Sequence, residues 1–158
     1  MADSKPIKRS QQLAPLSREH HDSLLFTWKI KQGLNNGTPA TAIISFVQWY
    51  WKNFLQQHFD EEEKLLLPCL PPADKLSLQL KAEHEKIKEM ITGSLHESSL
   101  AVLAEMINDH IRFEERQFFP HAEKELDENV LNSIYKQLDE HPHCSEKWED
   151  EFWVKKKT

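Results

Sequence analysis

Glycine is the residue that most constrains this fold, because the 158-residue chain contains only three. Average proteins contain about 7% glycine, and glycine supplies the backbone conformations that tight turns need. A sandwich or barrel of many strands needs a turn every ~8–12 residues, so these folds are excluded. Glycine-rich nucleotide loops of the G-x-G-x-x-G or P-loop type are absent from the sequence as well. We therefore expect a few long helices.

Helix start and stop signals divide the chain into four main helices and a weaker fifth. We expect helices over about 17–32, 38–67, 73–92, 98–126 and 127–140, with Ser17 capping the first and Pro120 kinking or breaking the fourth. Gly33, Pro68 and Gly93 mark three of the helix ends. The short joints predict an all-α, antiparallel up-down four-helix bundle with an extra C-terminal helical segment.

The length of the chain fits one domain with two short flanking segments. Residues 1–15 are polar, contain two prolines and are expected to form a flexible lead-in. The bundle should span residues 16–140. Residues 141–158 form an aromatic and basic tail, in which Trp148, Phe152 and Trp153 are candidates for packing back on the bundle.

Composition limits the expected partners and location. The chain has 26 Asp and Glu against 20 Lys and Arg, which gives a net charge of −6. This balance repels phosphates, so we expect neither nucleic acid nor a membrane as a partner. No window approaches the ~20 apolar residues of a membrane span, and the N-terminus lacks an apolar signal segment. Cys69 and Cys144 form no C-x-x-C pair. We expect a cytoplasmic protein with reduced thiols.

One eleven-residue pattern occurs twice and carries the chemistry of the chain. Residues 58–68 read HFDEEEKLLLP and residues 110–120 read HIRFEERQFFP, so both fit H-φ-x-x-E-E-x-x-φ-φ-P, where φ is apolar. Amphipathic helices share apolar positions in general, but not a His and a Glu at the same spacing. Residues four apart lie side by side on a helix. His58 therefore pairs with Glu62, and His110 with Glu114.

Both pairs continue the apolar stripe of their helix towards the core. The preceding stripe residues are Ile43, Val47, Tyr50 and Phe54 in one helix, and Leu100, Leu103 and Ile107 in the other. Burying an unpaired carboxylate costs several kcal/mol, and neither stripe contains Lys or Arg. We therefore predict a bound cation. Carboxylates can bridge two metals, and imidazole with carboxylate favours iron, zinc or manganese over calcium or magnesium.

The other two helices should supply the remaining ligands. His84 lies between Leu80 and Ile87 on an apolar stripe of the third helix. In the first helix His20 and His21 are both candidates. We favour His21, because Leu24, Leu25 and Trp28 follow it at helical spacing. The predicted metal ligands are His20, His21, His58, Glu62, His84, His110 and Glu114.

These residues resemble the hemerythrin-like (HHE cation-binding) domain family. The resemblance runs from about Leu16 to Leu126 and rests on Arg18-Glu19-His20-His21, His58 with Glu62, Glu83-His84, and His110 with Glu114. It implies a four-helix bundle around two non-haem iron ions, bridged by Glu62 and Glu114 and completed by the histidines. It also implies a role in binding or sensing dioxygen, iron or redox state, or in nitric-oxide stress.

The chain departs from the oxygen carriers of that family at two positions. Lys88 stands where they have a second histidine in the third helix, and their last carboxylate falls at Glu115 rather than at Glu114. These differences favour oxidation or turnover over reversible oxygen carriage. Glu63 and Glu115 are either hydrogen-bond partners of the ligands or part of a solvated face.

We predict a metal protein that binds or senses dioxygen or a related small oxidant, and not a dedicated enzyme. A sensor would need a protein partner. The alternatives are an iron, redox or nitric-oxide stress protein with incidental peroxide chemistry, an HD-type metal-dependent phosphohydrolase that uses His21-Asp22, and a bundle with a purely structural role. A ferritin-like protein is disfavoured, because its Glu-x-x-His spacing occurs only at Glu140–His143, across Pro142.

Overall fold

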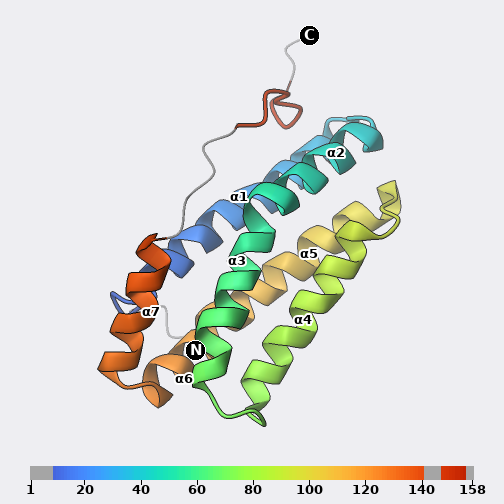
Figure 1. The fold of residues 1–158 in the computed structure, drawn as a ribbon. Coiled ribbons are helices and arrows are strands. Elements are labelled where there is room, and N and C mark those ends of the chain that lie inside the picture. The colour runs from blue at the N-terminus through green and yellow to red at the C-terminus, as the bar shows by residue number, and fades with distance from the viewer. Residues whose placement is uncertain (1–8, 141–146, 156–158) are drawn as a thin grey trace, which may run out of the picture.

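The computed structural model describes residues 9–140 and 147–155, and the regular structure in these residues is entirely helical (Figure 1). Helix α1 spans Ala14–Asn35 and α4 spans Lys75–Thr92. The second long helix joins α2 (Ala40–Tyr50), a π turn (Trp51–Leu55), α3 (Gln56–Glu61), a second π turn (Glu62–Leu66) and a short 3₁₀ turn (Leu67–Cys69). The fourth joins α5 (Glu97–Phe113), a π turn (Glu114–Phe118) and α6 (Phe119–Glu125), and α7 follows at Glu128–Glu140. The predicted all-helical bundle with an extra C-terminal helix is confirmed.

The four long helices lie side by side, and α7 packs at one end of the bundle (Figure 1). Only four or five residues join successive long helices, so neighbours run antiparallel. Leu131, Ile134 and Leu138 of α7 are buried against the same apolar cluster as Leu13 and Leu66. Helix α7 therefore closes the end of the bundle where α1 begins.

The core consists of two apolar clusters with a buried polar layer between them. Along α1, Leu16 belongs to one cluster and Phe26 to the other, with the buried His20 between them. Along α4, His84 likewise separates Leu80 from Ile87. The same order holds in the other two long helices. Apolar packing on both sides thus fixes the position of the polar layer along the bundle axis.

The beginning of the chain is more ordered than the sequence predicts. Helix α1 starts at Ala14 and not at Ser17, because a proline in the first helical turn is tolerated there. Leu13 and Leu16 are completely buried. The expectation of a flexible lead-in is therefore wrong for residues 9–15.

Pro120 does not break the fourth helix, which continues to Glu125. The π turn before it lets the Phe119 amide donate to the Glu114 carbonyl, five residues back. The Leu67 amide donates to the Glu62 carbonyl in the same way in the second helix. These two π turns therefore begin at the glutamate of each His-x-x-x-Glu pair and precede the proline of the repeat.

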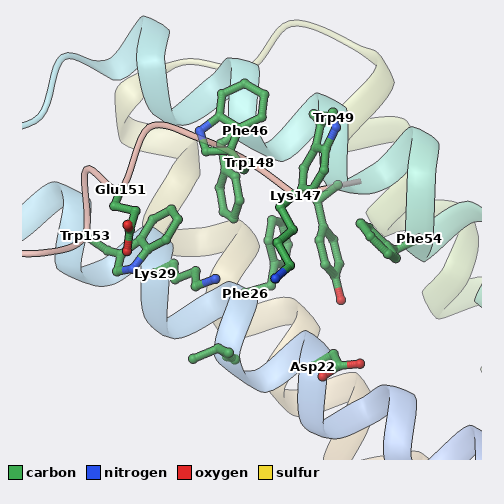
Figure 2. Close-up of a pocket in the computed structure, with 12 residues that line it drawn as sticks. Asp22, Phe26, Lys29, Phe46, Trp49, Phe54, Lys147, Trp148, Glu151 and Trp153 are labelled. Carbon is green, nitrogen blue, oxygen red and sulfur yellow. The ribbon is translucent and has the colours of Figure 1, made fainter. Parts of the chain in front are cut away.

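Part of the aromatic tail packs on α1 and α2, at the end of the bundle far from α7. Phe152 is buried against Gly33, where a Cβ would lie 2.6 Å from the phenyl ring, so only glycine fits without a shift. Figure 2 shows Trp148 and Trp153 beside Phe46, around a cavity of about 490 Å³. The packing of the tail on the bundle is confirmed for residues 147–155.

Among the described residues, the helices are too short or too polar to span a membrane.

Asp74 offers a test of how α4, and with it His84, is anchored. Its carboxylate accepts the Ser77 amide at 2.9 Å as the cap of α4, and lies 2.7 Å from Nε2 of His121 in α6. We expect Asp74→Ala to lower the free energy of unfolding by about 1–2 kcal/mol in chemical denaturation. Asp74→Asn keeps a cap acceptor and should lose less. Equal losses in the two variants would contradict the capping role.

Candidate metal centre

The polar layer contains six side chains from the four long helices. They are His20 of α1, His58 and Glu62 of the second helix, His84 of α4, and His110 and Glu114 of the fourth. None is more than 3% exposed, and both glutamates are fully buried. The repeat thus places its histidines and glutamates where the apolar stripes predict.

The six side chains form two overlapping groups of possible metal ligands. One group contains His20 and His58, and the other contains His84 and His110. Both groups also contain Glu62 and Glu114, and within each the ligand atoms lie no more than 4.8 Å apart. The two groups of possible ligands therefore share both carboxylates.

The inward atoms of the layer approach one another closely. Glu114 places one oxygen 2.7 Å from Nε2 of His20 and the other 3.2 Å from Nε2 of His84. It also contacts Nε2 of His110. Glu62 lies 3.4 Å from Nε2 of His58 and 3.1 Å from Nε2 of His84. Each carboxylate therefore reaches histidines of both groups.

A second set of glutamates faces the outer nitrogen of each histidine. Nδ1 of His84 lies 2.9 Å from Glu63, and Nδ1 of His110 lies 2.8 Å from Glu83. Nδ1 of His58 lies 3.4 Å from Glu19, and Nδ1 of His20 lies 3.4 Å from Glu115. A proton on Nδ1 that faces a carboxylate leaves the Nε2 lone pair directed inward, as metal-ligating histidines require.

These outer contacts always join two different helices. The glutamates are only partly buried, with 28–32% of each side chain exposed. Of the two possibilities left open, the structure favours a hydrogen-bond partner for Glu63, which contacts His84. Glu115 lies within ion-pair distance of His20, and its carboxylate accepts a hydrogen bond from Ser17. Glu19 and Glu83 were missed in this role, although each directly precedes a core histidine in the sequence.

His21 is exposed and belongs to neither group, so the preference for His21 over His20 is wrong. The preference rested on Leu24, Leu25 and Trp28, which are themselves 42–47% exposed. The inward face of α1 instead mixes large apolar, small and polar residues: Leu16, His20, Ser23, Phe26, Thr27, Ile30 and Gly33. The leucines and the tryptophan of α1 thus have the spacing of a core stripe, although they lie on the surface.

Charge within the layer shifts the pKa values of its groups. Burial lowers the pKa of His20, but the nearby carboxylate of Glu114 outweighs it and raises that pKa to about 9. The pKa values of His58 and His84 also rise well above the usual range, because their carboxylate partners outweigh burial. Burial alone would raise the pKa of Glu114, but His110 and His20 hold it well below its usual value.

The residues present fit a pair of metal ions. Several inward atoms are buried and make no hydrogen bond within the described residues: Nε2 of His20, His58 and His110, both oxygens of Glu62, and Oε2 of Glu114. Such atoms are costly unless a ligand satisfies them. Two imidazoles with carboxylates form a donor set typical of non-haem iron, and also suit zinc and manganese.

Two histidines near the layer take no part in it. His121 pairs with Asp74 at 2.7 Å, and His96 is an exposed residue just before α5. His141, His143 and Cys144 lie outside the described residues.

Comparison with known families agrees with this geometry. The sequence model of the hemerythrin HHE cation binding domain matches residues 11–122, which include the whole polar layer. No curated protein and no solved structure gives a significant match.

The pKa of His20 leads to a test on the metal-free protein. A pKa raised from 6.5 to about 9 on folding stabilises the protein fully below pH 6.5, and the contribution is lost as the pH rises through 9. The free energy of unfolding should fall over this window by up to roughly 3 kcal/mol, measured by urea denaturation after chelation. His20→Gln should flatten the profile and His21→Gln should not. Identical profiles for the two variants would contradict the assignment.

Proposed function

This chain belongs to the hemerythrin HHE cation-binding domain family, and we propose that it is a non-haem di-iron protein that binds or senses dioxygen or a related small oxidant. The observation that carries the proposal is the sharing of Glu62 and Glu114 by two groups of histidines. A single-ion site would leave one pair of buried imidazoles unused.

His20 and His58 would hold one ion, His84 and His110 the other, and Glu62 and Glu114 both. Two iron ions held there would supply one-electron redox chemistry toward a small oxidant. Zinc or manganese suits the same donors, so the preference for iron rests on the family and on the nitrogen and oxygen donor set.

The chain's own residues orient the ligands and exclude bulk water. Glu19, Glu63 and Glu83 orient His58, His84 and His110 through Nδ1, and Glu115 lies 3.4 Å from Nδ1 of His20. Apolar clusters cover the layer on both sides along the bundle. His84 borders a surface hollow of about 210 Å³, lined also by Glu63 and Lys88. This hollow offers a small molecule a route to His84.

An iron, redox or nitric-oxide stress role with incidental peroxide chemistry is the second candidate. The same centre would serve it, and the His84 hollow would admit nitric oxide or peroxide as readily as dioxygen. Titration of the iron-loaded protein with each of these molecules, followed by absorption spectroscopy, separates the two candidates.

The phosphohydrolase alternative loses its site in this structure. It requires His21 and Asp22 as metal ligands, but both side chains are exposed and lie outside the two ligand groups. We expect Asp22→Ala to leave the metal content unchanged, as measured by elemental analysis. A loss of metal in this variant would restore the alternative.

We also propose that the protein works in the cytoplasm, without nucleic acid or membrane as a partner. The exposed free thiol of Cys69 supports a reducing compartment, and the net charge of −6 disfavours anionic surfaces. Signalling by a sensor of this kind would require a protein partner.

Iron content tests the proposed function directly. Protein purified without a metal-binding tag should contain close to two irons per chain by elemental analysis. Replacing both bridging residues, Glu62→Ala with Glu114→Ala, should abolish binding at both positions, because each carboxylate reaches both groups.

The control is a doubly substituted exposed pair, Asp109→Ala with Arg112→Ala, which should keep both ions. Metal should also raise the unfolding temperature of the wild type and not that of the bridging variant. Full iron occupancy without the two glutamates would show that the site is elsewhere. Equal stability with and without metal would favour a purely structural bundle.

A further inference from the structure

The outer contacts of the polar layer are not equivalent, although its inner ligands are. Arg9 lies beside Glu115, whose carboxylate faces His20. Within the described residues, it is the only Lys or Arg within ion-pair distance of any of the four outer glutamates. The ion-pair partners that the described residues offer the other three glutamates are imidazoles, and Glu83 also accepts a hydrogen bond from Gln79.

The guanidinium of Arg9 is held from several sides. It donates to the Glu123 carboxylate and to the Glu115 backbone carbonyl, both at 2.6 Å, and to Oγ of Ser17 at 3.2 Å. Ser17 in turn donates to the Glu115 carboxylate at 2.8 Å. Only 9% of the Arg9 side chain is exposed. Such a network fixes the position of Glu115 more firmly than solvent would.

Arg9 also reaches His20 through an aromatic ring. The guanidinium lies 5.0 Å from the centre of the Phe119 ring. Phe119 stacks on the imidazole of His20 at 5.3 Å with an angle of 8° between the planes. Both the edge and the face of the His20 ring are therefore held by groups that Arg9 contacts.

The partner of His84 has no such support. His84 borders the hollow of about 210 Å³, and its partner Glu63 shares that hollow with Lys81 and Lys88, neither of which forms an ion pair with Glu63. Glu63 and Glu115 are similarly exposed, at 32% and 28%, but of the two only Glu115 is contacted by an arginine within the described residues.

We propose that Arg9 is a positioning residue of the metal centre, which fixes His20 through Glu115 and Phe119 and so strengthens ion binding at the His20–His58 position. This inference rests on the proposed function, because it requires two occupied positions. Partners of metal-bound histidines typically change metal affinity by about 10–100-fold. Arg9 should act at the low end of this range, since it touches the ligand indirectly.

The test is the release of iron to a chromogenic ferrous chelator under anaerobic conditions. Wild-type protein loaded with two ferrous ions should release them in two phases of equal amplitude. Arg9→Ala should accelerate one phase about tenfold and leave the other unchanged. Arg9→Lys keeps the charge but loses the forked contacts, so it should be intermediate. A purely structural role would accelerate both phases together.

Three further variants make the result specific. Arg112→Ala removes an exposed arginine two residues from His110 and should change neither phase. Glu83→Gln loosens His110 and should accelerate only the phase that Arg9→Ala leaves unchanged. If Arg9→Ala does not fold, Glu123→Ala removes an anchor of Arg9 and leaves Glu115 intact, and should accelerate the phase that Glu83→Gln leaves unchanged, to a lesser extent.

Equal acceleration of both phases, or no acceleration, in Arg9→Ala and Glu123→Ala would overturn the inference. If the wild-type protein binds two irons and Arg9→Ala releases them at the wild-type rates, the role of Arg9 is refuted but the proposed function is not. Wild-type protein that binds fewer than two irons would refute the proposed function, and the inference with it.

Discussion

Two fully buried carboxylates at the centre of the bundle are the constraint on which the rest of this structure depends. Glu62 and Glu114 cannot remain ionised there without positive charge beside them. In the metal-free chain the carboxylates raise the pKa values of the four surrounding histidines, so protons on these imidazoles offset negative charge in the layer. Bound cations would supply positive charge in their place.

The two apolar clusters fix the position of the polar layer along the bundle axis. Each long helix passes from one apolar cluster through the polar layer into the other. Packing on both sides fixes the helices at the height of the layer, so the histidines do not depend on a metal for their position along the axis. Rotation of the rings is the remaining freedom, and the outer glutamates restrict it by contacting Nδ1 from a neighbouring helix. The ligand geometry is thus largely prepared before an ion binds.

Sequence spacing was sufficient for the parts of the site that lie on one helix. The pairs His58–Glu62 and His110–Glu114 and the stripe position of His84 are all local patterns. Gly93 also marks the end of α4, but α1 begins before Ser17 and continues through Gly33 to Asn35. Spacing alone predicts the wrong inward face for α1, because Leu24, Leu25 and Trp28 have the spacing of core residues but are exposed. It also missed Arg9, whose contacts with Glu115 and Glu123 join residues more than 100 positions apart. No local pattern records which side chain of another helix faces a given histidine.

The doubled glutamate of the repeat shows why the irregular parts of the helices matter. Adjacent residues of a helix point about 100° apart, so Glu114 can face the ions while Glu115 faces the outer nitrogen of His20. In the π turn that starts at Glu114, the Phe119 amide donates to the Glu114 carbonyl. Pro120 has no backbone amide hydrogen, so it cannot donate to the next carbonyl, that of Glu115. The Glu115 carbonyl accepts from Arg9 instead. Pro120 thus leaves the Glu115 carbonyl free to accept from Arg9, and this hydrogen bond joins the N-terminal segment to the residue beside Glu114 of the polar layer.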